Sequence, residues 1–262
     1  MISVICVYNN INILNKYLLR TLRRQDSPFQ SITIDNTSGK YKSAPKILND
    51  FAGKARHDYI MFVHQDVGLR SDTWLTDVEA QIKTLDRFGA AGAAGKHVDG
   101  RFASSIWHGD PPEPINPARL REPVPVQTID GCLMIVSRAA FQKMPFDEQT
   151  CKGWYLYVAD YCLDLGRSGR KVYVLPNEVH HESPGPSDPK LYMNTVRDIV
   201  EKHKEHTPVI RTTIGEWDTR TFQLSSSMQP LPTVAPEKPR NDQEPSFRAA
   251  VRRLRKIWRK EQ

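Results

Sequence analysis

The chain has 262 residues, of which 39% are hydrophobic and 26% charged, which suits one folded domain with an appendage and excludes wholesale disorder. Its formal net charge is +7, but residues 247–262 hold seven Lys or Arg side chains against one acidic side chain, so nearly all of the excess lies there. Because the remainder is close to neutral, a nucleic-acid-binding surface is disfavoured and no nucleic-acid partner is expected.

The first part of the chain alternates apolar runs with amphipathic segments. Residues 2–8, 31–34 and 58–63 are short apolar runs typical of buried strands. Residues 13–22 and 44–55, which lie between them, have the apolar spacing of helices. This order predicts an α/β fold with a doubly wound, mostly parallel sheet and helices on both faces.

The middle of the chain continues this pattern around one long interruption. Residues 96–127 contain six prolines and predict a long irregular loop, of the kind that serves as a lid or binding loop. The elements expected on either side of it are helices at 74–88, 138–143 and 158–167 and strands at 89–95, 128–137 and 171–175.

The last part of the chain differs in composition. Prolines and serines predict a linker at 207–246, which would separate a catalytic domain at 1–206 from a basic amphipathic helix at 247–262. In this tail one helical stripe is apolar and the rest is Arg and Lys; the stripe consists of Phe247, Val251, Leu254 and Trp258. The pattern is typical of a helix lying on an anionic membrane surface, and a solvated or partner-binding helix is the alternative.

The cysteines and the apolar segments bear on the compartment. Cys6, Cys132, Cys151 and Cys162 form no Cys-x-x-Cys pair, and three of them lie in apolar runs, so we expect buried free thiols in a reducing cytosol. The sequence shows no signal-peptide pattern and no stretch of transmembrane length. We expect a cytoplasmic protein, peripheral on the inner face of the membrane.

Polar residues follow three of the predicted strands. They are Tyr8-Asn9, Asp35-Asn36 and His64-Gln65-Asp66. Because ligands of open parallel sheets bind beyond the carboxyl ends of the strands, we expect all three groups in one crevice. The first turn lacks Gly-x-Gly-x-x-Gly, which disfavours a dinucleotide-binding domain. A carboxylate such as Asp35 suits a ribose or base, and Asp66 suits a divalent cation bound to a diphosphate.

At this point the chain resembles the family 2 glycosyltransferases with the GT-A fold, over about residues 2–187. The order and spacing of several motifs carry the resemblance: Ser3-Val-Ile-x-x-Tyr-Asn9, Leu22-x-x-Gln25, Ile34-Asp35-Asn36, Ala44…Asn49, Asp58-Tyr-Ile-Met-Phe-Val-His-Gln-Asp66, Asp130-Gly131, Phe146-Asp147-Glu148 and Val179-x-His181-x-Ser183-x-Gly185.

The resemblance implies roles for these residues. It implies that Tyr8, Asn9, Asp35 and Asn36 contact the nucleotide of a nucleoside diphosphate sugar. It implies that Asp66 ends the metal-binding Asp-x-Asp motif, that His181 completes the metal or diphosphate site, and that Asp130 and Gly131 lie near the donor sugar and acceptor. The expected cofactor is a divalent cation, Mn²⁺ or Mg²⁺.

The chain departs from the family pattern at two positions. His64 replaces the first carboxylate of Asp-x-Asp; imidazole can ligate Mn²⁺ but suits Mg²⁺ poorly, and a hydrogen-bonding role for His64 is equally open. Val158 stands where the family places its general base, so the nearest carboxylate, Asp160, is the predicted catalytic base of an inverting transfer. Glu148 and Glu182 are the alternatives to it.

Competing structural roles exist for some of these side chains. Asp160 could cap a helix over 161–167, alone or together with a catalytic role. His180 and His181 are adjacent and should point to opposite sides of an extended strand, which disfavours a zinc site made of both. Trp154 and Trp107 could stack on a sugar ring, although aromatic residues in such segments more often pack.

The sequence therefore predicts a hexosyl or deoxyhexosyl transferase that moves a sugar, with inversion, onto a hydroxyl of a lipid-linked glycan in bacterial cell-surface polysaccharide synthesis. Two alternatives stay open. One is a non-catalytic nucleotide-sugar-binding or membrane-recruited adaptor, which Val158 favours because it stands in place of the general base. The other is a nucleotidyltransferase, which needs a Gly-rich, Lys-containing first loop that Tyr8-Asn9-Asn10 lacks.

Overall fold

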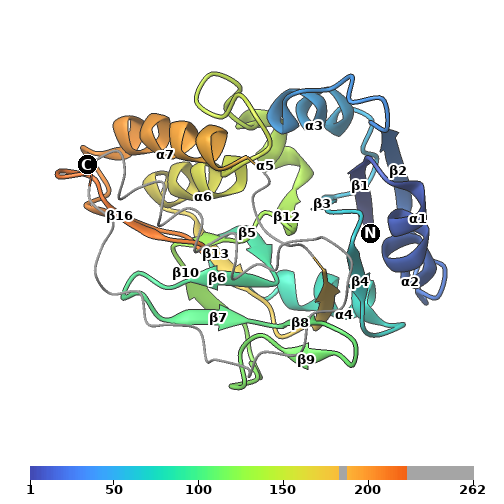
Figure 1. The fold of residues 1–262 in the computed structure, drawn as a ribbon. Helices are drawn as coiled ribbons and strands as arrows, with labels where there is room; N and C mark the ends of the chain where they lie inside the picture. Colours follow the sequence, from blue (N-terminus) through green and yellow to red (C-terminus); the bar gives the residue numbers. More distant parts are fainter. Residues whose placement is uncertain (183–187, 223–262) are drawn as a thin grey trace, which may run out of the picture.

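The protein is described here by a computed structural model that covers residues 1–182 and 188–222 (Figure 1). The predicted tail helix at 247–262 and the greater part of the predicted linker lie outside the described residues. Within them, no helix is both long enough and apolar enough to cross a bilayer.

A seven-stranded sheet in the order β10-β13-β5-β12-β3-β1-β2 forms the centre of the fold. Its strands are β1 (Ile2–Tyr8), β2 (Gln30–Asp35), β3 (Tyr59–Val63), β5 (Phe88–Gly92), β10 (Val124–Val126), β12 (Leu133–Ser137) and β13 (Lys171–Val174). Strand β12 runs antiparallel to both neighbours and β10 runs antiparallel to β13, while all other pairs are parallel. The predicted α/β, mostly parallel sheet is confirmed.

Helices cover both faces of this sheet. Successive residues of a strand point to opposite faces, so each strand contributes side chains to two separate cores. Ile5 and Phe62 pack into one core and Val4 and Met61 into the other. The first core is closed by α3 (Ala44–Ala52), α5 (Arg138–Lys143), α6 (Tyr157–Arg167) and α7 (Pro189–His203), which lie along one side of the sheet in Figure 1. The second is closed by α4 (Trp74–Ile82) and by the run of α1 (Ile11–Leu14), the π-helix η1 (Asn15–Leu19) and α2 (Arg20–Leu22).

Local signals explain where two of these helices begin. The side chain of Asn10 accepts the backbone N–H groups of Asn12 and Ile13 and so caps α1. Ser43 caps α3 in the same way, and Pro45 follows in its first turn, where a missing N–H costs nothing. The first cap matters for function because it sets a helix start directly beyond the end of β1.

The segment 96–127 is not the irregular loop that its prolines predict. It contributes β7 (Phe102–Ser104), β8 (Ile106–His108), β9 (Glu113–Pro114) and β10. Strand β7 pairs with β6 (Ala94–Lys96), which also pairs with β11 (Thr128–Ile129). Strands β8 and β9 extend a sheet with β14 (Val179–His181) and β4 (Val67–Leu69). The partners are distant in sequence, so local composition could not reveal these ladders.

Trp107 has a packing role in this region. Two guanidinium groups lie over its ring, Arg70 at 4.1 Å and Arg119 at 4.9 Å from the ring centre. Both arginines also approach the carboxylate of Glu178. The ring and the charges thus pack together, and the cation–π contacts give Trp107 a structural role.

The folded body extends past residue 206. Strands β15 (Val209–Arg211) and β16 (Glu216–Asp218) form an antiparallel hairpin. The side chain of Gln127 bonds to this hairpin through the Val209 carbonyl and the Arg211 N–H, in the manner of an additional strand. The linker predicted from 207 therefore cannot begin before 223; proline and serine content beyond that point obscured the short strands ahead of it.

A buried charge cluster joins α6 to α7. The ammonium group of Lys202 lies 2.7 Å from carboxylate oxygens of both Asp160 and Asp164 and 3.0 Å from one of Asp147. His203 Nε2 lies 2.8 Å from the other oxygen of Asp160. Burial alone would lower the pKa of Lys202, but the surrounding carboxylates raise it above its ordinary value.

We expect the approach of β6 to β11 to tolerate only glycine at position 95. A Cβ on Gly95 would overlap the carbonyl oxygen of Thr128, so Gly95→Ala should lower the free energy of unfolding by roughly 1–3 kcal/mol. Gly166→Ala in α6 is the matched control, because its Cβ meets nothing within 4 Å, and it should be neutral or slightly stabilising. Denaturant unfolding measures both, and an unchanged Gly95→Ala midpoint would contradict the packing described.

The Asp147 carboxylate should make stability depend on pH. Burial would raise its pKa, but bonds from Thr150 and from Lys202 outweigh burial and hold the pKa well below the ordinary value. Since the unfolded pKa is about 3.9, this stability is complete above that value and is lost as pH falls through the lower folded pKa. Asp147→Asn should therefore cost about 1–2 kcal/mol at pH 7 and progressively less below pH 4.

Urea titrations between pH 3 and pH 7 test this dependence. Asp50→Asn, which removes an exposed ion pair with Lys46 at 3.7 Å, is the control and should change little at any pH. A constant difference between wild type and Asp147→Asn across the range would rule out the linkage.

Candidate active site

The ends of β1 and β2 meet at the sheet edge that the sequence predicts. Tyr8 is the register partner of Asp35, and the Asn36 N–H donates to the Tyr8 carbonyl at 2.8 Å. Bonds from Thr37 hold the pKa of Asp35 below its ordinary value, so the carboxylate is charged at neutral pH. Partial burial and the adjacent charge of Asp35 raise the pKa of Tyr8. An exposed carboxylate and an aromatic ring thus stand side by side.

Asn36 has its own side chain engaged. Its amide nitrogen donates to the carbonyl of Tyr41 and its amide oxygen accepts the Tyr41 N–H, at 3.0 and 2.8 Å. The residue is buried. Asn36 therefore shapes the loop after β2, and the structure leaves Asp35 as the exposed group of this pair.

Gln65 belongs to a polar group that the sequence places in the crevice, but the sequence predicts no role for it. Its side-chain oxygen accepts the backbone N–H groups of Asn9 and Asn10, and its nitrogen donates to Asn9 Oδ1 at 2.6 Å. The turn after β3 is thereby tied to the turn after β1. In the sequence Gln65 lies between His64 and Asp66, which are predicted metal ligands. Its bonds to Asn9 and Asn10 join segments far apart in the sequence, so no local pattern could indicate them.

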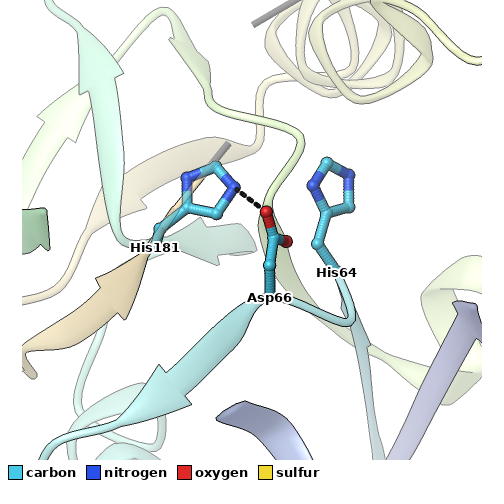
Figure 2. A group of neighbouring side chains, drawn as sticks. All are labelled: His64, Asp66 and His181. Carbon is cyan, nitrogen blue, oxygen red and sulfur yellow. Dashed lines mark ion pairs between the residues drawn. The ribbon is translucent and has the colours of Figure 1, made fainter. Parts of the chain in front are cut away.

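His64, Asp66 and His181 come together as a group of three metal-ligating side chains. Figure 2 shows the Asp66 carboxylate between the two imidazole rings. One ligand atom from each lies within 4.8 Å of the others, and His181 Nε2 is 3.6 Å from Asp66 Oδ2. His64 follows β3 and its N–H donates to the Cys132 carbonyl, while His181 is brought in by β14.

The donor set fits a divalent cation. His181 Nε2 is buried and makes no hydrogen bond, so it presents an unused lone pair or N–H toward Asp66. Burial lowers the pKa of His64, although the charge of Asp66 acts against this, so its ring is neutral and can ligate through nitrogen. Two imidazoles and a carboxylate form a chemically coherent ligand set.

The two adjacent histidines point to opposite sides of β14, as expected. His180 stacks on Tyr17 with ring centres 5.5 Å apart, and its Nε2 lies 2.8 Å from Glu182. Glu182 also accepts the Gly109 N–H at 3.2 Å. Glu182 thus belongs to the His180 side of the strand, and the structure does not bring it to the group containing His181.

Asp130 also lies close to His181. Its two oxygens accept the Cys132 N–H and the Thr213 hydroxyl, at 2.9 and 2.6 Å. Burial would raise the pKa of Asp130, but His181 and these donors outweigh it and lower the pKa, so the carboxylate is charged. Burial raises the pKa of Cys132 well above its ordinary value, which keeps the thiol protonated. Thr213 belongs to the β15–β16 hairpin and lies beyond the predicted domain end, so sequence reasoning missed it.

Gly131 lies next to Val158, the residue that stands where the family pattern has its general base. A Cβ on Gly131 would lie 4.0 Å from a methyl group of Val158, and Val158 is buried in the first turn of α6. Trp154, just before α6, is half-buried and packs on the core of that face. An apolar side chain therefore borders Asp130-Gly131 where the family pattern has a carboxylate.

The structure does not bring Asp160 to this site. Its side chain is 2% exposed and both oxygens are taken, one by Lys202 and one by His203. It also does not cap α6, because this helix begins at Tyr157, within a residue of the predicted start at 158 and one turn before the 161–167 helix that Asp160 would cap. A buried carboxylate held by a cation cannot reach an acceptor hydroxyl, so the assignment of Asp160 as the catalytic base is corrected. Glu148 is likewise engaged, by Asn49 on α3 at 3.0 Å.

Solved structures with the same fold share little sequence with this chain. GalNAc-T7 with UDP, GalNAc and Mn²⁺ aligns with a TM-score of 0.54 and 13% identity over 77% of this chain and 47% of that chain. TarS 1–349 of S. aureus in complex with UDP-GlcNAc gives 0.52 and 16% over 77% and 66%. The mannosyltransferase PcManGT of Pyrobaculum calidifontis with GDP-Man and Mn²⁺ gives 0.53 and 11% over 78% and 63%. At these identities the likeness establishes the GT-A fold, and the chain spans between about half and two thirds of each structure.

Comparison of amino-acid sequences identifies the family. A protein of Fuscovulum blasticum described as "ATP synthase subunits region ORF 6" is 23% identical over 184 residues, which is 68% of this chain and 72% of that protein. A family described as "Glycosyltransferase like family" matches residues 3–207. Since this match covers most of the chain, including the strand ends and His181, the protein belongs to that glycosyltransferase-like family and has its GT-A fold.

Proposed function

We propose that the protein is a glycosyltransferase that moves a hexosyl or deoxyhexosyl group from a nucleoside diphosphate sugar to a hydroxyl of a glycan. The observation that carries the proposal is the arrangement of one sheet edge. There Tyr8 and Asp35, the predicted nucleotide contacts, lie in register, and Gln65 ties the turn that follows Tyr8 to the turn that holds His64 and Asp66, which lie together with His181. The solved structures of the same fold that hold UDP, UDP-GlcNAc or GDP-Man support this choice of donor.

The nucleotide would lie against the ends of β1 and β2. The charged, exposed carboxylate of Asp35 could accept hydrogen bonds from ribose hydroxyls or a base N–H in addition to the bond from Thr37, and the Tyr8 ring offers a stacking face. Asn9 presents an exposed amide whose orientation is fixed by Gln65. Asn36 supports this surface through the loop it shapes.

His64, Asp66 and His181 would hold a divalent cation, which would neutralise charge on the leaving diphosphate. These side chains arrive from the end of β3 and from β14, so the backbone ladder fixes their spacing. A preorganised set of this kind loses little conformational entropy on binding.

Asp130, Gly131 and Trp154 would border the donor sugar and the acceptor. For an inverting transfer we propose that Asp130 takes the proton of the acceptor hydroxyl, because it is ionised, lies beside His181 and adjoins Gly131, which faces Val158. Thr213 and the Cys132 N–H would orient its oxygens.

The setting of the reaction rests on the basic amphipathic tail at 247–262. We propose that this segment binds anionic lipid on the cytoplasmic face of a bacterial membrane, where a lipid-linked acceptor for cell-surface polysaccharide would be found.

A non-catalytic nucleotide-sugar-binding protein is the second candidate. Two observations favour it. Val158 is buried at the position expected for the base, and Asp160 is bound by Lys202 between α6 and α7. A binding protein would keep the donor site and have no turnover. A nucleotidyltransferase stays disfavoured because the turn after β1 is Asn9-Asn10 and contains neither Gly nor Lys.

Donor binding should stabilise the folded protein in a metal-dependent way. At about 100 times Kd, one of the UDP, GDP, dTDP or CMP sugars with Mn²⁺ should raise Tm by roughly 5 °C or more. Asp66→Asn should remove most of this shift, because it removes the charged ligand, whereas Asp72→Asn at an exposed ion pair should keep it. If no nucleotide sugar shifts Tm of the folded wild type, the donor assignment falls.

Turnover should depend on Asp130 and be insensitive to the chemistry of Asp160. We expect Asp130→Asn to lower kcat by about 10²–10⁴-fold with donor binding retained. Asp160→Asn should lower Tm, because it disturbs the Lys202 cluster, and should leave kcat of the folded fraction within a few-fold. The opposite pattern would restore Asp160 as the base, and absent turnover in the wild type with donor binding intact would favour the binding protein.

A further inference from the structure

We infer that the centre formed by His64, Asp66 and His181 prefers Mn²⁺ and similar imidazole-accepting transition ions to Mg²⁺, and that His64 is the residue that sets this preference. The inference deepens the proposed function, on which it rests for the role of the cation but not for its binding. It starts from a departure of this chain: a ligand position occupied by a carboxylate in Asp-x-Asp is an imidazole here.

The ligand atoms decide the preference. Two of the three available donors are ring nitrogens and one is a carboxylate oxygen, all within 4.8 Å of one another. Mg²⁺ binds oxygen ligands at near-ideal octahedral geometry and loses water reluctantly. Mn²⁺, Co²⁺ and Zn²⁺ accept imidazole readily. Each carboxylate replaced by imidazole therefore removes charge and oxygen that Mg²⁺ needs and retains a donor that the transition ions accept.

Both imidazoles are held by the backbone. His64 is fixed at the end of β3 by its N–H bond to the Cys132 carbonyl at 2.8 Å. His181 is the register partner of Val67 across β14 and β4, and its carbonyl oxygen lies 2.9 Å from His108 Nδ1. The rings tilt by 57° with centres 5.8 Å apart (Figure 2), so they approach Asp66 without stacking on each other.

A further carboxylate lies close to the centre. One oxygen of Asp130 lies within 4.8 Å of a ring nitrogen of His181, and its two oxygens accept the Cys132 N–H and the Thr213 hydroxyl. The negative charge of this carboxylate adds to that of Asp66 and favours a cation beside His181.

The test compares Mn²⁺ and Mg²⁺ affinities of the full chain by calorimetry, after removal of metal with a chelator and without any nucleotide. We expect the wild type to bind Mn²⁺ at least about 10-fold tighter than Mg²⁺. His64→Asp, which rebuilds Asp-x-Asp, should reduce this ratio by about 10-fold or more, mainly by tightening Mg²⁺. His206→Asp makes the same chemical change at an exposed position and should leave the ratio unchanged.

Pulsed electron paramagnetic resonance of bound Mn²⁺ gives a second readout. The wild type should show ¹⁴N coupling from imidazole, and His64→Ala should weaken both this coupling and Mn²⁺ affinity, the latter by about 10–100-fold. This variant keeps the test decisive if His64→Asp does not fold. An unchanged ratio in folded His64→Asp, or Mn²⁺ bound without ¹⁴N coupling in the wild type, would overturn the inference.

None of these measurements needs a sugar nucleotide. Failure of every donor to bind would therefore remove the proposed function and leave the metal preference standing. A centre that binds Mn²⁺ and Mg²⁺ alike, in a protein that still binds a donor, would remove only the preference.

Discussion

The antiparallel ladder between β4 and β14 is the constraint on which the candidate site depends. It sets His181 opposite Val67, one residue after Asp66, although the two strands are far apart in the sequence. Without this pairing, the chain would hold only the ligands that follow β3. Because ladder hydrogen bonds fix position along the strand, a slip of one residue would turn His181 to the side where His180 stacks on Tyr17.

A second constraint explains how the opposite side of the site is built. The ammonium group of Lys202 binds carboxylates of α6 and of the turn at Asp147, so it fixes α7 against α6. With α6 in this position, the side chain next to Gly131 is Val158, which is apolar and buried in the first turn of the helix. Asp160 thus helps to hold α6 against α7 through its contacts with Lys202 and His203.

Much of the site followed from the sequence, because it lies at strand ends. Tyr8, Asp35, His64 and Asp66 each follow an apolar run, and an α/β alternation is enough to gather such residues at one edge. His181 came from the family resemblance. The partners of Asp160 did not follow, because Lys202 lies on a helix whose packing no local pattern specifies. The role of Gln65 and the contribution of Thr213 were missed for the same reason: each acts through a bond to a distant segment.

The amide of Gln65 has a thermodynamic consequence. The amide of Gln65 binds Asn9 and Asn10, which lie beside the proposed nucleotide contacts. Gln65 itself lies in the turn that holds His64 and Asp66, the proposed cation ligands. If the proposed cation and nucleotide bind here, a displacement of this turn by one ligand would move the backbone that contacts the other. Thermodynamic linkage requires such an effect to be reciprocal: the factor by which the cation changes the affinity for the nucleotide equals the factor by which the nucleotide changes the affinity for the cation. Gln65 is the side chain through which the two proposed binding sites would be coupled.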